Sequence, residues 1–195
     1  MCRQKQCWLE LTVGVGEYLA HGTPVALVHG GELDDRDVTR FFLIRGERTF
    51  VQDPGFGFRQ LVDVAIRALS PAVNDPTTAV QAIDRISDLL AITGSRPDPT
   101  GLRIDASGTV RIKRKLRNFD ALLVLALTEV IRYGADAPQV VRRLHGLLGE
   151  LGSTLPGERQ AAITGQRTLL EAAASAALPA PFASVASAAD REGLG

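Results

Sequence analysis

The most informative pattern in the chain is a helical spacing of apolar positions between residues 58 and 69. Apolar side chains recur three or four residues apart through this stretch, and Val64 and Ala68 widen the apolar face. Only a narrow polar stripe remains, so we expect a helix that protein covers on most sides. Pro71 disfavours helical geometry at Ser70, and the helix is predicted to end there.

A second helix is predicted to follow after a tight corner over residues 70–75. Asp75 suits the N-cap position, and Pro76 suits the first turn. The apolar residues that follow at helical spacing define the buried face of this helix: Ala79, Ile83, Ile86 and Leu90.

Apolar and polar side chains that alternate every second residue, and short apolar runs between turns, predict strands before and after these two helices. Residues 9–15 alternate between apolar and polar side chains, and residues 24–28 form a second apolar run after a turn. The stretch 38–45 is too uniformly apolar to distinguish a strand from a short helix. Residues 102–113 predict a β-hairpin, with Gly108 in the connection where a left-handed residue is needed.

Three more helices are predicted, over about residues 119–133, 138–151 and 156–177. We therefore predict an α+β fold in which the helices over 58–69 and 119–133 form the interior of a helical bundle. The predicted domains are an N-terminal β-rich unit (1–50), a helical domain containing the hairpin at about 102–113 (51–177), and a flexible tail (178–195).

A long motif surrounds the two central helices. It runs through Arg48-Thr49, Gln52-Asp53-Pro54, residues 57–63, residues 67–71 and residues 74–79. In these residues the chain resembles domain-of-unknown-function family 2254, a bacterial family of predicted membrane proteins, and weaker similarity extends over about residues 9–177. Members of that family usually carry transmembrane helices ahead of this region. The resemblance therefore implies a soluble C-terminal region, on the cytoplasmic side, of a membrane-associated protein whose membrane segment is missing from this chain.

Composition narrows the classes of partner. The 195 residues include 22 basic and 22 acidic side chains, so the global charge favours neither nucleic acid nor an acidic surface. Cys2 and Cys7 lack a second Cys or His pair at metal-binding spacing, and the three histidines are widely scattered. We predict no metal site, no cofactor and no nucleic-acid partner. No apolar run approaches the roughly 18 residues of a membrane span.

The corner between the two central helices is the first candidate site. The start of a helix presents unpaired backbone N–H groups, and two threonine hydroxyls lie beside them, a combination that suits a phosphate or a carboxylate. The alternative is structural, with Asp75 filling the cap and Asn74 closing its own turn. The candidate ligand-binding residues of the corner are Ser70, Asn74, Asp75, Thr77 and Thr78.

The polar stripe of the first helix is the second candidate. Arg59, Asp63 and Arg67 follow one another at i,i+4 spacing, which places the carboxylate between two guanidinium groups. Asp63 could act as a base or a metal ligand, and a paired arginine could clamp an anion. The alternative is an ion-paired helix surface that contributes little energy.

A dense basic cluster over residues 111–117 is the third candidate. Such a surface could contact anionic lipid headgroups, at roughly 1 kcal/mol per charge. The alternative is a solvated strand edge that its charges protect from association. The cluster contains Arg111, Lys113, Arg114, Lys115 and Arg117.

Together these observations favour a regulatory or assembly domain over an enzyme. We expect it to act by self-association as a homo-oligomer or by a ligand-linked change of shape, with a membrane surface as a second partner. The alternative is a small-anion-binding domain or an enzyme that uses the Ser70–Thr78 corner with Arg59 and Asp63.

Overall fold

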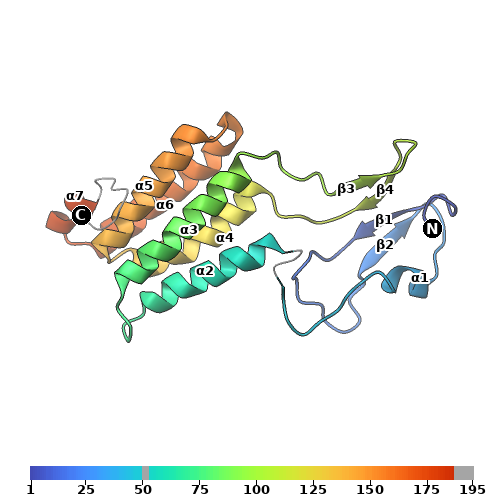
Figure 1. Ribbon diagram of the computed structural model, residues 1–195, viewed down its shortest axis with the longest axis horizontal. Coiled ribbons are helices and arrows are strands. Elements are labelled where there is room, and N and C mark those ends of the chain that lie inside the picture. The colour runs from blue at the N-terminus through green and yellow to red at the C-terminus, as the bar shows by residue number, and fades with distance from the viewer. Residues whose placement is uncertain (50–52, 187–195) are drawn as a thin grey trace. The chain divides into compact units, whose positions relative to one another are not determined.

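The computed structural model describes residues 1–49 and 53–186 and has an α+β fold, which confirms the predicted class (Figure 1). The described residues group into two compact units. The first comprises Met1–Phe56 and Pro99–Arg117, and the second comprises Gly57–Asp98 and the described residues from Asn118 onward. The domain boundary predicted at residues 50 and 51 lies outside the described residues.

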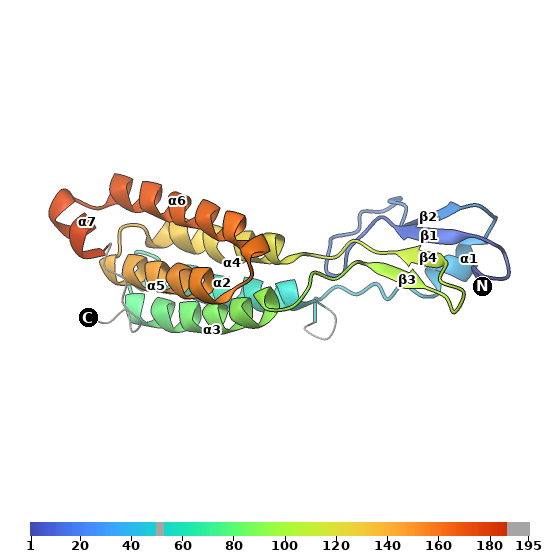
Figure 2. The ribbon, with the colours of Figure 1, turned by 90° about the horizontal axis from the view of Figure 1, so that it is seen from above.

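A four-stranded sheet in the order β2-β1-β4-β3 organises the first unit (Figure 2). Its strands are β1 (Trp8–Leu11), β2 (Ala26–His29), β3 (Leu102–Ile104) and β4 (Val110–Lys113). Strand β1 pairs antiparallel with β2 and parallel with β4, where Leu9 lies opposite Ile112. The predicted hairpin therefore completes the N-terminal sheet, whereas the sequence analysis assigned it to the helical domain.

Local signals explain the connections of this sheet. Gly108 has a φ of 81° in the predicted hairpin turn, a conformation that glycine adopts without a steric penalty. The ambiguous stretch after residue 38 resolves as the end of a short helix, α1 (Asp35–Thr39), followed by irregular chain. The Asp34 side chain caps α1 by accepting a hydrogen bond from the Arg36 amide at 2.9 Å.

Packed helices form the second unit (Figures 1 and 2). Helix α3 packs against α4 and α5, and α6 packs against the same two helices. Ile83, Leu123, Leu144 and Leu170 have no exposed surface and anchor the common core. The helices are α2 (Pro54–Ala68), α3 (Pro76–Gly94), α4 (Phe119–Gly134), α5 (Pro138–Thr154), α6 (Gln160–Ala177) and α7 (Ala180–Ala186), with a 3-10 turn at Gly157–Arg159.

Two sequence expectations for this unit need adjustment. The interior does not belong to α2 and α4 alone, because α3 and α5 each bury as many residues as α4, and Val124 of α4 is 51% exposed. The first part of the predicted flexible tail forms α7, which packs against α5, and Leu178 and Ala186 belong to the buried core. The rest of that tail, residues 187–195, lies outside the described residues.

Candidate functional site

The corner after α2 is closed by its own backbone. The Asp75 amide donates to the Ala68 carbonyl at 2.8 Å, and the Asn74 amide donates to the Ser70 carbonyl at 2.8 Å. The Ser70 hydroxyl donates to the Arg67 carbonyl at 2.7 Å. Asn74 has a φ of 48°, a left-handed conformation that asparagine tolerates better than most residues. The corner therefore keeps a defined shape without a ligand.

The start of α3 already holds a carboxylate. One oxygen of Asp75 accepts from the Thr78 amide at 3.0 Å, and the other accepts from the Thr78 hydroxyl at 2.5 Å. These hydrogen bonds from Thr78 lower the pKa of the Asp75 carboxyl. An external anion at this position would compete with Asp75 for the same donors, while the neighbouring Thr77 is exposed.

The stripe residues on α2 are directed toward α4 and toward each other. The Nη1 and Nη2 atoms of Arg59 donate to one oxygen of Glu129 at 2.6 and 2.7 Å, and its Nε lies 3.7 Å from Asp63. Arg59 precedes the last residue of α2 by nine positions, which is about 13 Å along a helix axis. The structure therefore brings Arg59 and Asp63 together but does not bring either to the corner. Arg67 is exposed, and within the described residues no ion pair joins it to Asp63.

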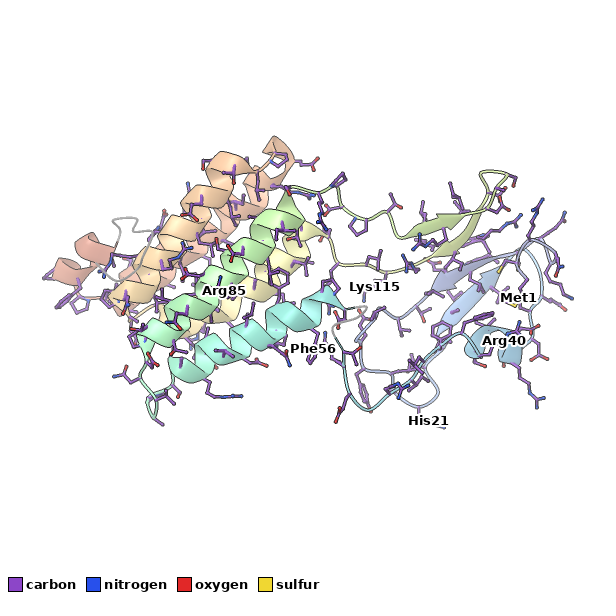
Figure 3. All side chains as sticks on the ribbon, in the orientation of Figure 1. Met1, His21, Arg40, Phe56, Arg85 and Lys115 are labelled. Carbon is purple, nitrogen blue, oxygen red and sulfur yellow. The ribbon has the colours of Figure 1, made fainter. Side chains whose placement is uncertain are left out.

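The basic cluster is largely neutralised inside the first unit. Carboxylates lie opposite four of its five members: Asp105 at 2.8 Å from Arg111, Glu10 at 2.8 Å from Lys113, Glu17 at 2.8 Å from Lys115, and Asp53 at 3.5 Å from Arg117. The remaining member, Arg114, is half-buried. Figure 3 shows Lys115 on the segment that follows β4. These pairs reduce the positive charge that a membrane surface would meet at this position.

Lys113 and Lys115 lower the pKa of the carboxylates that they pair with. Hydrogen bonding from Lys113 lowers the pKa of the Glu10 carboxyl. A hydrogen bond from the Gly14 amide lowers the pKa of the Glu17 carboxyl, and a weaker effect in the same direction comes from the hydrogen bond of Lys115. Both carboxylates therefore stay charged at neutral pH and hold the lysines in place.

Asp53 is a buried carboxylate around which several donors gather. It belongs to the long sequence motif, but no role was predicted for it. Its side chain is 3% exposed and accepts from Arg48 Nε at 3.0 Å and Nη2 at 2.5 Å. It also accepts from the Phe56 amide at 3.2 Å, as an N-cap of α2 would, and from Arg117 at 3.5 Å. A Cβ atom at Gly16 would collide with the Asp53 carboxylate, so the chain approaches this centre closely at a glycine with a φ of 75°.

A hollow of about 880 Å³ opens beside this centre in the first unit. Val15 and Gly16 line one part of it, and residues 43–49 line another. The lining combines apolar side chains, namely Val15, Leu43 and Ile44, with the polar groups of Arg45, Glu47, Arg48, Thr49 and Asp53. A site of this composition suits a molecule that has both an apolar and an anionic part.

Two buried arginines in the helical unit were also missed. Arg159, 3% exposed, donates to Asp98 at 2.5 Å and to the Arg96 carbonyl at 3.0 Å. Arg143, 5% exposed, donates to Asp84 of α3 at 2.5 Å. Arg143 stands beside apolar residues, which is a weak sequence signal of burial, whereas Arg159 lies in a polar stretch without such a signal. Asp98 and Asp84 lie 61 and 59 residues away in the chain from the arginines that they pair with.

Two further features, a metal site and a membrane-spanning helix, are absent from the described ranges. Within residues 1–49 and 53–186 there is no group of three or more His, Cys, Asp or Glu side chains placed to hold a metal ion. In the same ranges no helix combines the length and the apolar character that a membrane crossing requires.

Comparison with known proteins gives a family but no activity. The model of a family described as predicted membrane protein (DUF2254) matches residues 1–150. Uncharacterized proteins of Mycobacterium bovis (Mb1321c) and Mycobacterium tuberculosis (Rv1290c) are each 36% identical over 129 residues, which is 66% of this chain and 25% of each relative. The matched region thus spans about a quarter of the length of these relatives. No solved structure matches the chain.

Proposed function

This chain belongs to the DUF2254 family of predicted membrane proteins, and we propose that it serves such a protein as a regulatory or assembly domain. The observation that carries the proposal is the internal pairing of the charged groups that a catalytic site would need. Arg59 is bound to Glu129, Asp75 caps its own helix, and Arg143 is bound to Asp84. The charges of these groups are occupied by contacts within the fold.

Self-association is the mode of action that the helical unit supports best. Arg85, Leu89 and Ile92 follow one another at i,i+4 and i,i+3 spacing on α3 and therefore share a face. Leu89 is 36% exposed and Ile92 is 48% exposed, while Arg85 pairs with Asp88 at the edge of this face (Figure 3). An apolar pair with a charged margin suits contact with the same face of a second copy.

Native mass spectrometry of the purified chain tests this proposal. We expect a symmetric oligomer for the wild-type chain and a monomer for the double variant Leu89→Glu, Ile92→Glu. Val124→Glu is a matched control, because Val124 is 51% exposed on α4, outside this face. A wild-type chain that stays monomeric across a concentration series would contradict self-association. Turnover of a substrate that Asp63→Ala abolishes would contradict the proposal as a whole.

The alternative remains a small-anion-binding domain or an enzyme at the Ser70–Thr78 corner. The geometry supports it less, because Asp75 already accepts both Thr78 donors. It requires extra mass in the native spectrum, or binding of inorganic phosphate, that Thr78→Val removes without unfolding the chain. Asp63→Asn should leave such binding unchanged, since Asp63 lies on α2 well before the corner.

A further inference from the structure

We infer that the first unit docks on an anionic phospholipid bilayer through the apolar segment Phe41–Ile44 and the adjoining Arg45. This goes beyond the assembly role, and it relies on the proposed function only in placing the chain beside a membrane. The segment follows α1, and its residues Leu43 and Ile44 line the hollow described above. It is distinct from the basic cluster at residues 111–117.

The first observation is the exposure of the segment. Phe41 is 70% exposed, Leu43 is 77% exposed and Ile44 is 70% exposed, within four consecutive residues. Scattered exposed apolar residues are ordinary on protein surfaces, but a contiguous group of large ones marks a contact site. The segment has irregular backbone, so its side chains are presented at the surface by a loop.

The second observation is a neighbouring apolar loop. Val15 and Gly16 line the same hollow as Leu43 and Ile44, so the two loops border one another within the first unit. Val15 is 42% exposed, and Tyr18, three residues further along that loop, is 92% exposed. Aromatic rings with a polar tip are favoured at the boundary between headgroups and acyl chains.

The third observation is the charge beside these apolar groups. Arginines flank the segment on both sides: Arg40, labelled in Figure 3, lies at the end of α1, and Arg45 follows Ile44 in the sequence. The guanidinium of Arg40 lies 4.9 Å from the centre of the Phe41 ring and 3.7 Å from Asp37. The Arg45 side chain is exposed on the lining of the hollow. Arginine binds phosphate oxygens well, so Arg45 is placed to meet a lipid phosphate while Leu43 and Ile44 enter the acyl boundary.

These features favour a bilayer over a protein partner. A protein interface needs a buried apolar centre surrounded by a polar rim, whereas this segment is four consecutive residues of irregular chain with an arginine at each end. Shallow insertion of a few large apolar side chains beside basic groups is the pattern of an interfacial anchor. The family of predicted membrane proteins supplies the surface to which such an anchor would bind.

Co-sedimentation with vesicles tests the inference on the full chain. Two vesicle types are used, phosphatidylcholine alone and phosphatidylcholine with phosphatidylglycerol. We expect the wild-type chain to bind the anionic vesicles more strongly. Phe41→Ser with Leu43→Ser should reduce the partition roughly tenfold or more, because two large side chains lose their transfer into the acyl boundary. Arg45→Gln should reduce only the preference for anionic vesicles.

Matched controls separate this segment from the rest of the unit. Leu102→Ser with Ile104→Ser removes two apolar side chains of edge strand β3 that are 41% and 65% exposed, and should leave the partition unchanged. Far-ultraviolet circular dichroism confirms that each variant folds.

Three results would overturn the inference. The first is an equal loss of vesicle binding in the β3 control and the Phe41, Leu43 variant. The second is no binding of the folded wild-type chain to either vesicle type. The third is a change of oligomeric state in the Phe41, Leu43 variant without vesicles, which would assign the segment to a contact between copies. Native mass spectrometry without lipid tests self-association separately, so the lipid contact can fail while the assembly role stands.

Discussion

The ion pair between Arg159 and Asp98 predicts an unequal response to removal of its two partners. The Arg159 side chain is 4% exposed, and that of Asp98 is 37% exposed. Asp98 has a second task, because its other oxygen accepts from the Phe119 amide at 2.8 Å, at the start of α4. Hydrogen bonding from Arg159 lowers the pKa of the Asp98 carboxyl, so it is charged at neutral pH.

Removal of Asp98 should destabilise the chain more than removal of Arg159. Asp98→Ala removes the nearest carboxylate of the buried guanidinium and leaves it the exposed Glu158 at 3.5 Å, at a cost of roughly 3 kcal/mol. The substitution also removes a helix-capping acceptor, at about 1 kcal/mol. We therefore expect a loss of about 3–4 kcal/mol in the free energy of unfolding. Arg159→Met replaces the buried charge with an apolar chain of similar length and leaves Asp98 able to bind water. We expect that variant to lose about 1–2 kcal/mol.

Urea denaturation at neutral pH, followed by circular dichroism at the helical band, measures both values. Arg85→Met is the control, because Arg85 pairs with Asp88 at 3.3 Å with both side chains well exposed. It should change the free energy of unfolding by less than about 0.5 kcal/mol. A larger loss for Arg159→Met than for Asp98→Ala would refute the reasoning that the buried guanidinium depends on its carboxylate.

Three further predictions concern glycine packing, a histidine and the corner. Gly94→Ala should lower the free energy of unfolding in urea by about 1–3 kcal/mol, because the new Cβ would overlap Leu155 and Phe119. Gly149→Ala should raise it by about 0.5–1 kcal/mol, because the new Cβ on α5 would meet open space and alanine favours a helix. Burial lowers the pKa of His145 in the folded chain below its unfolded value of about 6.5, so the unfolded state binds a proton first as the pH falls. The free energy of unfolding should therefore decrease as the pH drops below about 6.5, and His145→Gln should reduce this decrease in a series of thermal melts at different pH values. Asn74→Ala should lose about 1 kcal/mol while Asn74→Gly loses little, since the φ of Asn74 is 48°; equal losses would contradict a backbone cause.

Elements with local signals could be predicted from the sequence. Asp75 and Pro76 were expected to begin a helix, and α3 begins at Pro76 with Asp75 as its cap. The predicted hairpin has its left-handed residue at Gly108. These features depend on conformational preferences of adjacent residues, which the sequence displays directly.

Features that join distant residues could not be predicted in the same way. The parallel pairing of β1 with β4 brings Leu9 beside Ile112, and no single-sequence pattern encodes that register. Glu129 lies in the helix predicted over residues 119–133, and the structure makes it the partner of Arg59. The charges at Arg59 and Asp63 are visible in the sequence, but the partner on α4 depends on where α2 and α4 meet in the fold.

The balance of 22 basic and 22 acidic residues has a consequence for recognition. Long-range pairs such as Arg59 with Glu129, Arg143 with Asp84 and Lys113 with Glu10 use charges to connect elements within each unit. The segment Phe41–Ile44 is the exposed apolar group of the first unit proposed to contact lipid, with the exposed guanidinium groups of Arg40 and Arg45 on either side of it. A contact of this kind depends mainly on transfer of apolar surface, which salt does not screen. Binding to anionic vesicles should accordingly fall only slightly when the ionic strength is raised. A steep salt dependence would instead assign the contact to the paired residues of the basic cluster.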